Sequence, residues 1–292
     1  MLNIYECCST SIFKQYDSLL VYERKVFDDL DIEDIHEMRV CVRKIRSALR
    51  VFRPCLPEDK YNYINKDIKK LARSLGAVRD LDVAITFFLS YEKLTANNKG
   101  VSFLIDYCRK RRLIRHEEMI SFLKSKKHMK LKENLIVLAK FLSAKKEDER
   151  NEAVYSAYYE RLNLVIDNVF AFEEITDLIS SEIELHDLRI AIKNLRYNLE
   201  FYNLTVPESV RILKILKSYQ YILGMINDYS IMVERITEIA RKNRLKRPEK
   251  EGIKLFLKHL EDLKRREKIK LVLPWDVLSS ETIKNLYLSD SV

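Results

Sequence analysis

Apolar residues recur along most of this chain at intervals of three and four positions, the spacing that places them on one face of an α-helix. In the segment 36–52, HEMRVCVRKIRSALRVF, the apolar side chains from Met38 to Phe52 share one arc of such a helix. Glycines and prolines, which interrupt helices, number only 4 and 5. The pattern therefore predicts an all-α protein. We expect helices over about 11–28, up to Phe52, 60–94, 101–123, 131–144, 151–171, 182–202 and through Gly224, whereas residues 248–292 are less regular.

The segment at 36–52 occurs twice. It returns as HDLRIAIKNLRYNLEFY at 186–202, which is 150 residues later in a chain of 292. A second motif, LGAVRD, returns as LGMIND at an offset of 148 residues. Because two separate motifs return at nearly the same distance, we interpret the chain as an internal duplication. The charged stretch AKKEDER at 144–150 is the expected linker, and it divides the chain into helical halves at 1–147 and 148–292.

The polar face of the repeated segment is a row of cations. At about 100° per residue, the basic side chains fall within one narrow stripe opposite the apolar arc. Like charges one turn apart repel each other by a few tenths of a kcal/mol, so such a row is mildly unfavourable unless acids or a ligand neutralise it. A solvated basic face is the simplest explanation, but the return of the same positions in phase favours a binding surface for anions. The first ladder is His36, Arg39, Arg43, Arg46 and Arg50; the second ladder is His186, Arg189, Lys193 and Arg196, with Glu200 at the fifth position.

The helix that carries each glycine motif adds more cations. Gly76 and Gly224 each cost a helix about 1 kcal/mol relative to alanine, which favours close helix packing or a kink over ligand contact as their reason. Asp80 and Asp228 are kept in phase, and we expect them to pair with ladder cations. The added cations are Lys66, Lys69 and Arg73 in the first copy, bordered by Lys70, and Arg211, Lys214 and Lys217 in the second. The copies diverge where Tyr221 aligns with Arg73, Ser218 with Lys70 and Asn227 with Arg79.

The net charge of the chain is +9 at pH 7, which favours anionic partners without selecting among them. Its 5 cysteines form no CxxC pair, so neither a disulfide framework nor a zinc site is indicated. The N-terminus, MLNIYECCST, does not have the pattern of a secretory signal, and no apolar run approaches the length of a membrane span. We therefore expect a cytoplasmic protein that uses no metal or other cofactor and does not bind a membrane.

These paired motifs, present in both halves and in the same order, resemble the CHAD family over essentially the whole chain. The resemblance implies two four-helix bundles related by pseudo-twofold symmetry around a basic central cavity. It also implies binding of inorganic polyphosphate, free or in granules, rather than catalysis. Family members often carry a fused CYTH domain, whose ExExK signature does not occur in this sequence. The chain is therefore similar to a stand-alone version.

Carried over residue by residue, the resemblance implies a set of phosphate-binding side chains. A linear polyanion has no base edges to read, so its recognition depends on charge and on the planar donors of arginine. We hypothesise that His36 and His186 donate hydrogen bonds to the polyanion and become charged on binding. The implied binding residues are His36, Arg39, Arg43, Lys44, Arg46, Arg50, Lys66, Lys69, Arg73, His186, Arg189, Lys193, Arg196, Lys214 and Lys217, supported by Asp80, Asp228, Gly76 and Gly224.

Two other functions stay open. The basic helices and 16 tyrosines would suit RNA, with Tyr197 placed beside the second ladder for base stacking, although aromatics do not alternate with the cations. A metal-dependent phosphohydrolase would use His36, His186, Asp80 and Asp228 as ligands. So many neighbouring arginines and lysines would repel a divalent cation, and the sequence has no glycine-rich phosphate loop. Binding of polyphosphate is the favoured expectation.

Overall fold

The computed structural model describes residues 4–28, 31–95, 97–145, 152–174, 179, 181–202, 207–271 and 278–288. Over these residues the chain is helical apart from short turns and connections, and no strand occurs among them. The predicted all-α class is confirmed. The helices are α1 (Ile4–Asp28), α2 (Ile32–Val51), α3 (Glu58–Leu94), α4 (Lys99–Leu123), α5 (Lys126–Ser143), α6 (Glu152–Phe170), α7 (Glu182–Tyr202), α8 (Pro207–Lys242), α9 (Arg247–Lys270) and α10 (Ser280–Leu288).

The chain forms two compact units. The N-terminal unit comprises Leu2–Arg150 and Lys246–Gly252, and the C-terminal unit comprises Asn151–Leu245 and Ile253–Val292. The start of α9 belongs to the N-terminal unit, where Asn98 donates a hydrogen bond to the Gly252 carbonyl at 3.2 Å. A Cβ on Gly252 would lie 2.7 Å from the Gly100 nitrogen, so this helix start needs glycine. The halves predicted from the linker, 1–147 and 148–292, place these residues of α9 in the second half.

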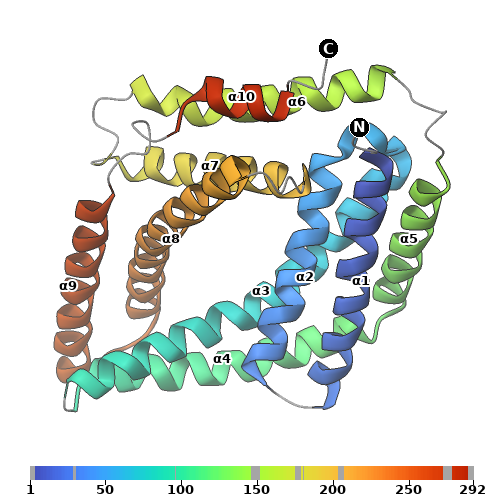
Figure 1. Ribbon diagram of the computed structural model, residues 1–292. Helices are drawn as coiled ribbons and strands as arrows, with labels where there is room; N and C mark the ends of the chain where they lie inside the picture. The colour runs from blue at the N-terminus through green and yellow to red at the C-terminus, as the bar shows by residue number, and fades with distance from the viewer. Residues whose placement is uncertain are drawn as a thin grey trace. The chain divides into compact units, whose positions relative to one another are not determined.

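In the N-terminal unit, α1, α2, α3 and α5 pack around one core (Figure 1). Helices α1 and α3 each contact both α2 and α5. Helix α4 packs along α3. The apolar arc predicted for α2 lines this core, because every member is at most 1% exposed. The arc consists of Met38, Val42, Ile45, Ala48, Leu49 and Phe52.

The ends of α2 follow from local chemistry. The carboxylate of Asp31 accepts a hydrogen bond from the Glu33 backbone nitrogen at 2.9 Å, which caps the first turn. At the other end, Pro54 cannot continue the backbone hydrogen bonding of a helix, and the chain passes into a short 3-10 turn at Arg53–Cys55. The ladder is therefore held on one well-bounded helix.

The C-terminal unit repeats the order of elements. Helix α6 contacts α7 and α10, α7 contacts α8, and a buried hydrogen bond of 2.5 Å between Ser209 and Tyr287 joins α8 to α10. Helix α9 lies beside α8, where Glu267 acts electrostatically on Tyr229 (Figure 1). The internal duplication stays a prediction from the repeated motifs. The basic cavity that the resemblance implies stays a prediction.

The region 248–292, which seemed irregular in sequence, contains the two regular helices α9 and α10. Ile253, Phe256 and Leu260 of α9 are buried at helical spacing. Charged residues surround this narrow apolar stripe and obscure its period in the sequence.

Candidate functional site

The first ladder lies on the side of α2 that faces α3. The Nε atom of Arg39 is 3.9 Å from the point that a Cβ on Gly76 of α3 would occupy. Arg73, one turn earlier on α3, is close enough to act on the charge of Arg46. Two helices therefore bring their cations to one place.

Arg46 is the centre of this cluster. Burial, followed by the charges of Arg50, Arg73 and Arg39, lowers the pKa of its guanidinium. Every charged neighbour that shifts it is another arginine, so the surroundings disfavour its charge instead of compensating it. We call Arg39, Arg46, Arg50 and Arg73 the arginine cluster.

Several cations predicted for the first copy form no ion pair with an acid among the described residues. Elsewhere in the same unit, Lys70 binds Asp67 at 2.8 Å and Lys132 binds Glu23 at 2.7 Å. Within the described part of the chain, the following predicted site residues form no ion pair: Arg43, Lys44, Arg46, Lys66, Lys69 and Arg73. The first copy thus holds positive charge that the described protein does not neutralise.

The other residues predicted for the first copy are distributed around this cluster. Lys66 and Lys69 are exposed on α3, about two turns and one turn before Arg73, respectively. Lys44 is exposed on another side of α2, where its charge acts on Cys41. The exposed Asp80 lies one turn after Gly76, and its pairing with ladder cations stays a prediction.

The first turn of the ladder carries His36 beside Arg79 of α3. Burial, followed by the charge of Arg79, lowers the pKa of His36, while Glu33 and Glu37 act in the opposite direction. The Nδ1 atom of His36 is buried and has no hydrogen-bond partner among the described residues. Sequence reasoning did not include Arg79 in the site, although its position before Asp80 in the repeated motif marked it as different from the second copy.

One group of possible metal ligands occurs in the described part of the chain. Ligand atoms of Glu33, His36 and Glu37 lie within 4.8 Å of one another. The charges of Arg79 and Arg43 act on the same imidazole, so a divalent cation there would meet strong repulsion. The metal ligands considered from sequence were His36, His186, Asp80 and Asp228, and this group shares only His36 with them.

The second ladder has internal partners. The Nε atom of Arg196 donates a hydrogen bond to Gln220 Oε1 at 2.6 Å, and its Nη1 atom donates to Glu200 Oε1. The same carboxylate oxygen lies 3.9 Å from Lys217 Nζ. At the start of the ladder, His186 Nδ1 and Asn227 Oδ1 are 2.7 Å apart, where the first copy has the Arg79 cation. In the second copy, Arg196 and Lys217 therefore share one carboxylate, and His186 faces a neutral amide instead of an arginine.

The remaining second-copy residues contribute less charge to this place. Arg189 has a buried Nε atom without a hydrogen-bond partner among the described residues, and Lys193 is half-buried on α7. Lys214 is exposed on α8, and Asp228 accepts a hydrogen bond from the Asn227 side chain at 3.3 Å. Tyr221 is 68% exposed at the position that Arg73 takes in the first copy.

The expected packing role of the repeated glycines is wrong for Gly224. A Cβ on Gly224 would have no described atom within 4 Å, and one on Gly76 would be in ordinary contact with Arg39. Neither glycine has a positive φ angle. Both positions would accept an alanine, so the glycines leave open space beside the ladders.

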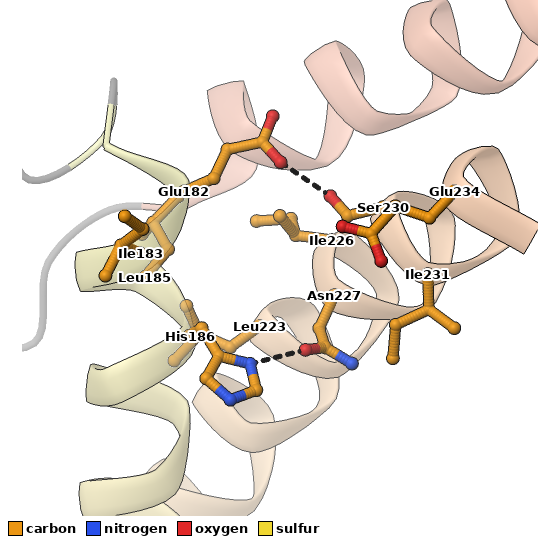
Figure 2. Close-up of a pocket in the computed structure, with 10 residues that line it drawn as sticks. All are labelled: Glu182, Ile183, Leu185, His186, Leu223, Ile226, Asn227, Ser230, Ile231 and Glu234. Carbon is orange, nitrogen blue, oxygen red and sulfur yellow. Dashed lines mark hydrogen bonds between the residues drawn. The ribbon is translucent and has the colours of Figure 1, made fainter.

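A cavity of about 310 Å³ lies at the start of the second ladder, between α7 and α8 (Figure 2). Figure 2 shows His186 bonded to Asn227 and Glu182 bonded to Ser230 across it. The carboxylates of Glu182 and Glu234 line this cavity together with several aliphatic side chains. Such a lining does not suit a phosphate anion, because the carboxylates repel it and the aliphatic groups offer it no hydrogen bonds. The lining residues are Glu182, Ile183, Leu185, His186, Leu223, Ile226, Asn227, Ser230, Ile231 and Glu234.

The chain belongs to the CHAD domain family, because residues 10–237 match the model of that domain. Its fold is similar to the crystal structure of the CHAD domain from the plant Ricinus communis, with 24% identity, a TM-score of 0.66 and coverage of 92% of both chains. It is also similar to PptA from Streptomyces chartreusis, with 16% identity, a TM-score of 0.67 and coverage of 91% of this chain and 96% of that one. At these identities the likeness concerns the fold alone.

A search of curated proteins found no match. The family match ends within α8, ahead of α9 and α10. Among the described helices, none combines the length and the apolar character needed to cross a membrane.

Proposed function

We propose that this protein binds inorganic polyphosphate on the N-terminal unit, through the arginine cluster and the flanking lysines of α3. One observation carries the proposal: Arg46 is half-buried among Arg39, Arg50 and Arg73, and all the charges that shift its pKa are positive. A folded protein that holds cations close together in this way is stabilised when a polyanion neutralises them. Membership of the CHAD domain family supports the same ligand class.

The arrangement favours a chain of phosphates over a single one. Cations repeat along α2 and α3 at each helical turn, a rise of about 5.4 Å, so several phosphate groups can be contacted together. Arginine also offers two parallel donors to each phosphate. Affinity should therefore rise with the length of the polyphosphate and fall with salt, because each contact releases condensed counterions.

The proposed role is binding without hydrolysis. Cleavage of the phosphoanhydride bond in a metal-assisted reaction needs a divalent cation at the phosphate. The His36 imidazole, a candidate ligand, lies under the influence of Arg79 and Arg43. The same side chains suit stabilisation of a bound anion, so we assign them to binding.

The test compares a paired loss of cluster charge with a matched loss elsewhere. Arg46→Gln with Arg73→Gln removes two cluster cations, and Lys127→Gln with Lys140→Gln removes two exposed charges of α5 in the same unit. Binding of labelled long-chain polyphosphate is measured by fluorescence anisotropy at 150 mM NaCl. We expect a loss of at least about 30-fold for the arginine pair and about twofold or less for the lysine pair.

Two competitors and an activity assay complete the experiment. Orthophosphate should compete poorly, and single-stranded RNA should displace polyphosphate only at much higher nucleotide concentration. Equal competition by RNA would replace this ligand with nucleic acid. Release of orthophosphate with Mg²⁺ or Mn²⁺ would contradict the assignment to binding alone. Equal losses for the two double variants would show that net charge, and not this cluster, is responsible.

A further inference from the structure

Glu200 stands in the second ladder at the position that Arg50 takes in the first. It lies one helical turn after Arg196, so its carboxylate is directed at the ladder's own cation. The substitution therefore does more than remove a positive charge. It places an anion where the first copy has a fifth cation.

The contacts of this carboxylate are those of a bound anion. Glu200 Oε1 accepts a hydrogen bond from Arg196 Nη1 and lies 3.9 Å from Lys217 Nζ, so it contacts cations from both α7 and α8. Gln220 Oε1 accepts a hydrogen bond from Arg196 Nε at 2.6 Å. The Arg196 side chain is only 12% exposed, whereas that of Glu200 is 33% exposed. The Arg196 guanidinium therefore lies deeper in the protein than the Glu200 carboxylate, which is on the solvent side.

At the equivalent place in the first copy, positive charges surround the arginine. Arg46 corresponds to Arg196 and is surrounded by Arg39, Arg50 and Arg73. Lys69 corresponds to Lys217, is exposed, and forms no ion pair within the described part of the chain. At this point the second copy has the Glu200 carboxylate in place of Arg50 and Tyr221 in place of Arg73.

We infer that Glu200 is an internal substitute for a phosphate group, which occupies the anion position of the second ladder and restricts polyphosphate to the first. The inference rests on the proposed function, since it names the residue that decides which copy takes the ligand. An anion tethered one turn away competes at a high effective concentration, so a phosphate from solution displaces it poorly. Removal of the carboxylate should open a second binding ladder.

The test uses the full chain and four variants. Glu200→Gln removes the internal anion, and Glu200→Asp keeps a carboxylate at that position. Glu238→Gln is the matched control, because Glu238 also pairs with a cation four residues away, Lys242, and its loss changes the net charge equally. The fourth variant combines Glu200→Gln with Arg46→Gln and Arg73→Gln, so that only the second ladder can bind.

We expect Glu200→Gln to bind long-chain polyphosphate about fivefold more tightly than the original chain at 150 mM NaCl, with a steeper salt dependence. The control and Glu200→Asp should stay within about twofold. In the arginine-depleted background, Glu200→Gln should restore at least about tenfold of the lost affinity. Equal affinities for Glu200→Gln and Glu238→Gln, with a binding-competent original chain, would overturn the inference. An original chain that does not bind polyphosphate would instead overturn the proposed function.

Thermal unfolding gives a second readout. Without ligand, Glu200→Gln should melt at a lower temperature, because Arg196, whose side chain is only 12% exposed, loses its charged partner. Added polyphosphate should raise its melting temperature more than that of the original chain, since the ligand replaces the lost anion. If this variant does not fold, Glu200→Met provides the same loss of charge. An equal ligand-induced rise in the original chain and in the variant would contradict the inference.

Discussion

Replacement of Arg46 by methionine should stabilise the free protein and weaken its binding of polyphosphate. In the structure, this half-buried guanidinium has three arginine neighbours, and all three lower its pKa. Methionine retains an unbranched side chain but removes the charge and the cost of burying it. Stability and affinity should therefore move in opposite directions.

The stability gain can be estimated from like-charge repulsion. At about 0.3 kcal/mol for each of the neighbours Arg39, Arg50 and Arg73, the substitution should add about 1 kcal/mol to the free energy of unfolding. For a chain of this length, that corresponds to a rise of about 2 °C in melting temperature. The loss of one charged hydrogen-bond donor to phosphate should weaken binding by about tenfold and lower the slope of log affinity against log salt by about one.

Differential scanning fluorimetry measures the first effect and fluorescence anisotropy across a salt series the second. Arg46→Lys is the control, because it retains the charge and should retain most of the repulsion and most of the affinity. A methionine variant that loses both stability and affinity would make Arg46 a structural residue. An unchanged affinity would remove the arginine cluster from the binding site.

Three further outcomes follow from particular side chains. Because burial and Arg79 lower the pKa of His36 in the folded protein, the unfolded chain binds more protons at this residue. The free energy of unfolding should therefore fall as the pH drops below about 6.5, and polyphosphate affinity should rise over the same pH range. His36→Gln should flatten both curves in pH-dependent melting and binding assays. Glu23→Gln should lower the free energy of unfolding by about 3 kcal/mol in urea titration, with unchanged polyphosphate affinity, because Glu23 is buried and bonded to His128 at 2.9 Å. Tyr287→Phe should lower the free energy of unfolding by about 1 kcal/mol through loss of the buried hydrogen bond to Ser209, and an unchanged stability would show that this hydrogen bond contributes nothing.

Prediction from sequence succeeded where one helix contains the whole signal. The apolar arc from Met38 to Phe52 needed only the helical period, and its residues are buried as expected. The ladder residues of α2 share a stripe for the same reason. Helix α9 was missed because Phe256 and its few apolar neighbours are diluted by charges, so the period is weak without its packing partners.

The site required information that no single helix holds. Arg79 acts on His36 only because α2 crosses α3 at that level, and Gln220 reaches Arg196 only because α7 lies against α8. Spacing along one helix does not specify which residue of a neighbouring helix stands opposite. The sequence did reveal that the copies diverge at Glu200, but the meaning of this divergence depends on the contacts of the carboxylate.

If the ladders bind polyphosphate as proposed, the difference in charge between the two motif copies has a small effect on stability. Repulsion of Arg46 by Arg39, Arg50 and Arg73 costs the free protein about 1 kcal/mol, against a total stability of about 5–15 kcal/mol for a typical domain. Two such clusters would double that cost in the absence of ligand. In the second copy, Glu200 and Gln220 contact Arg196, and Asn227 contacts His186, so these two ladder residues have internal partners. The first copy keeps the cost, and for that reason its stability should respond to polyphosphate while that of the second should not.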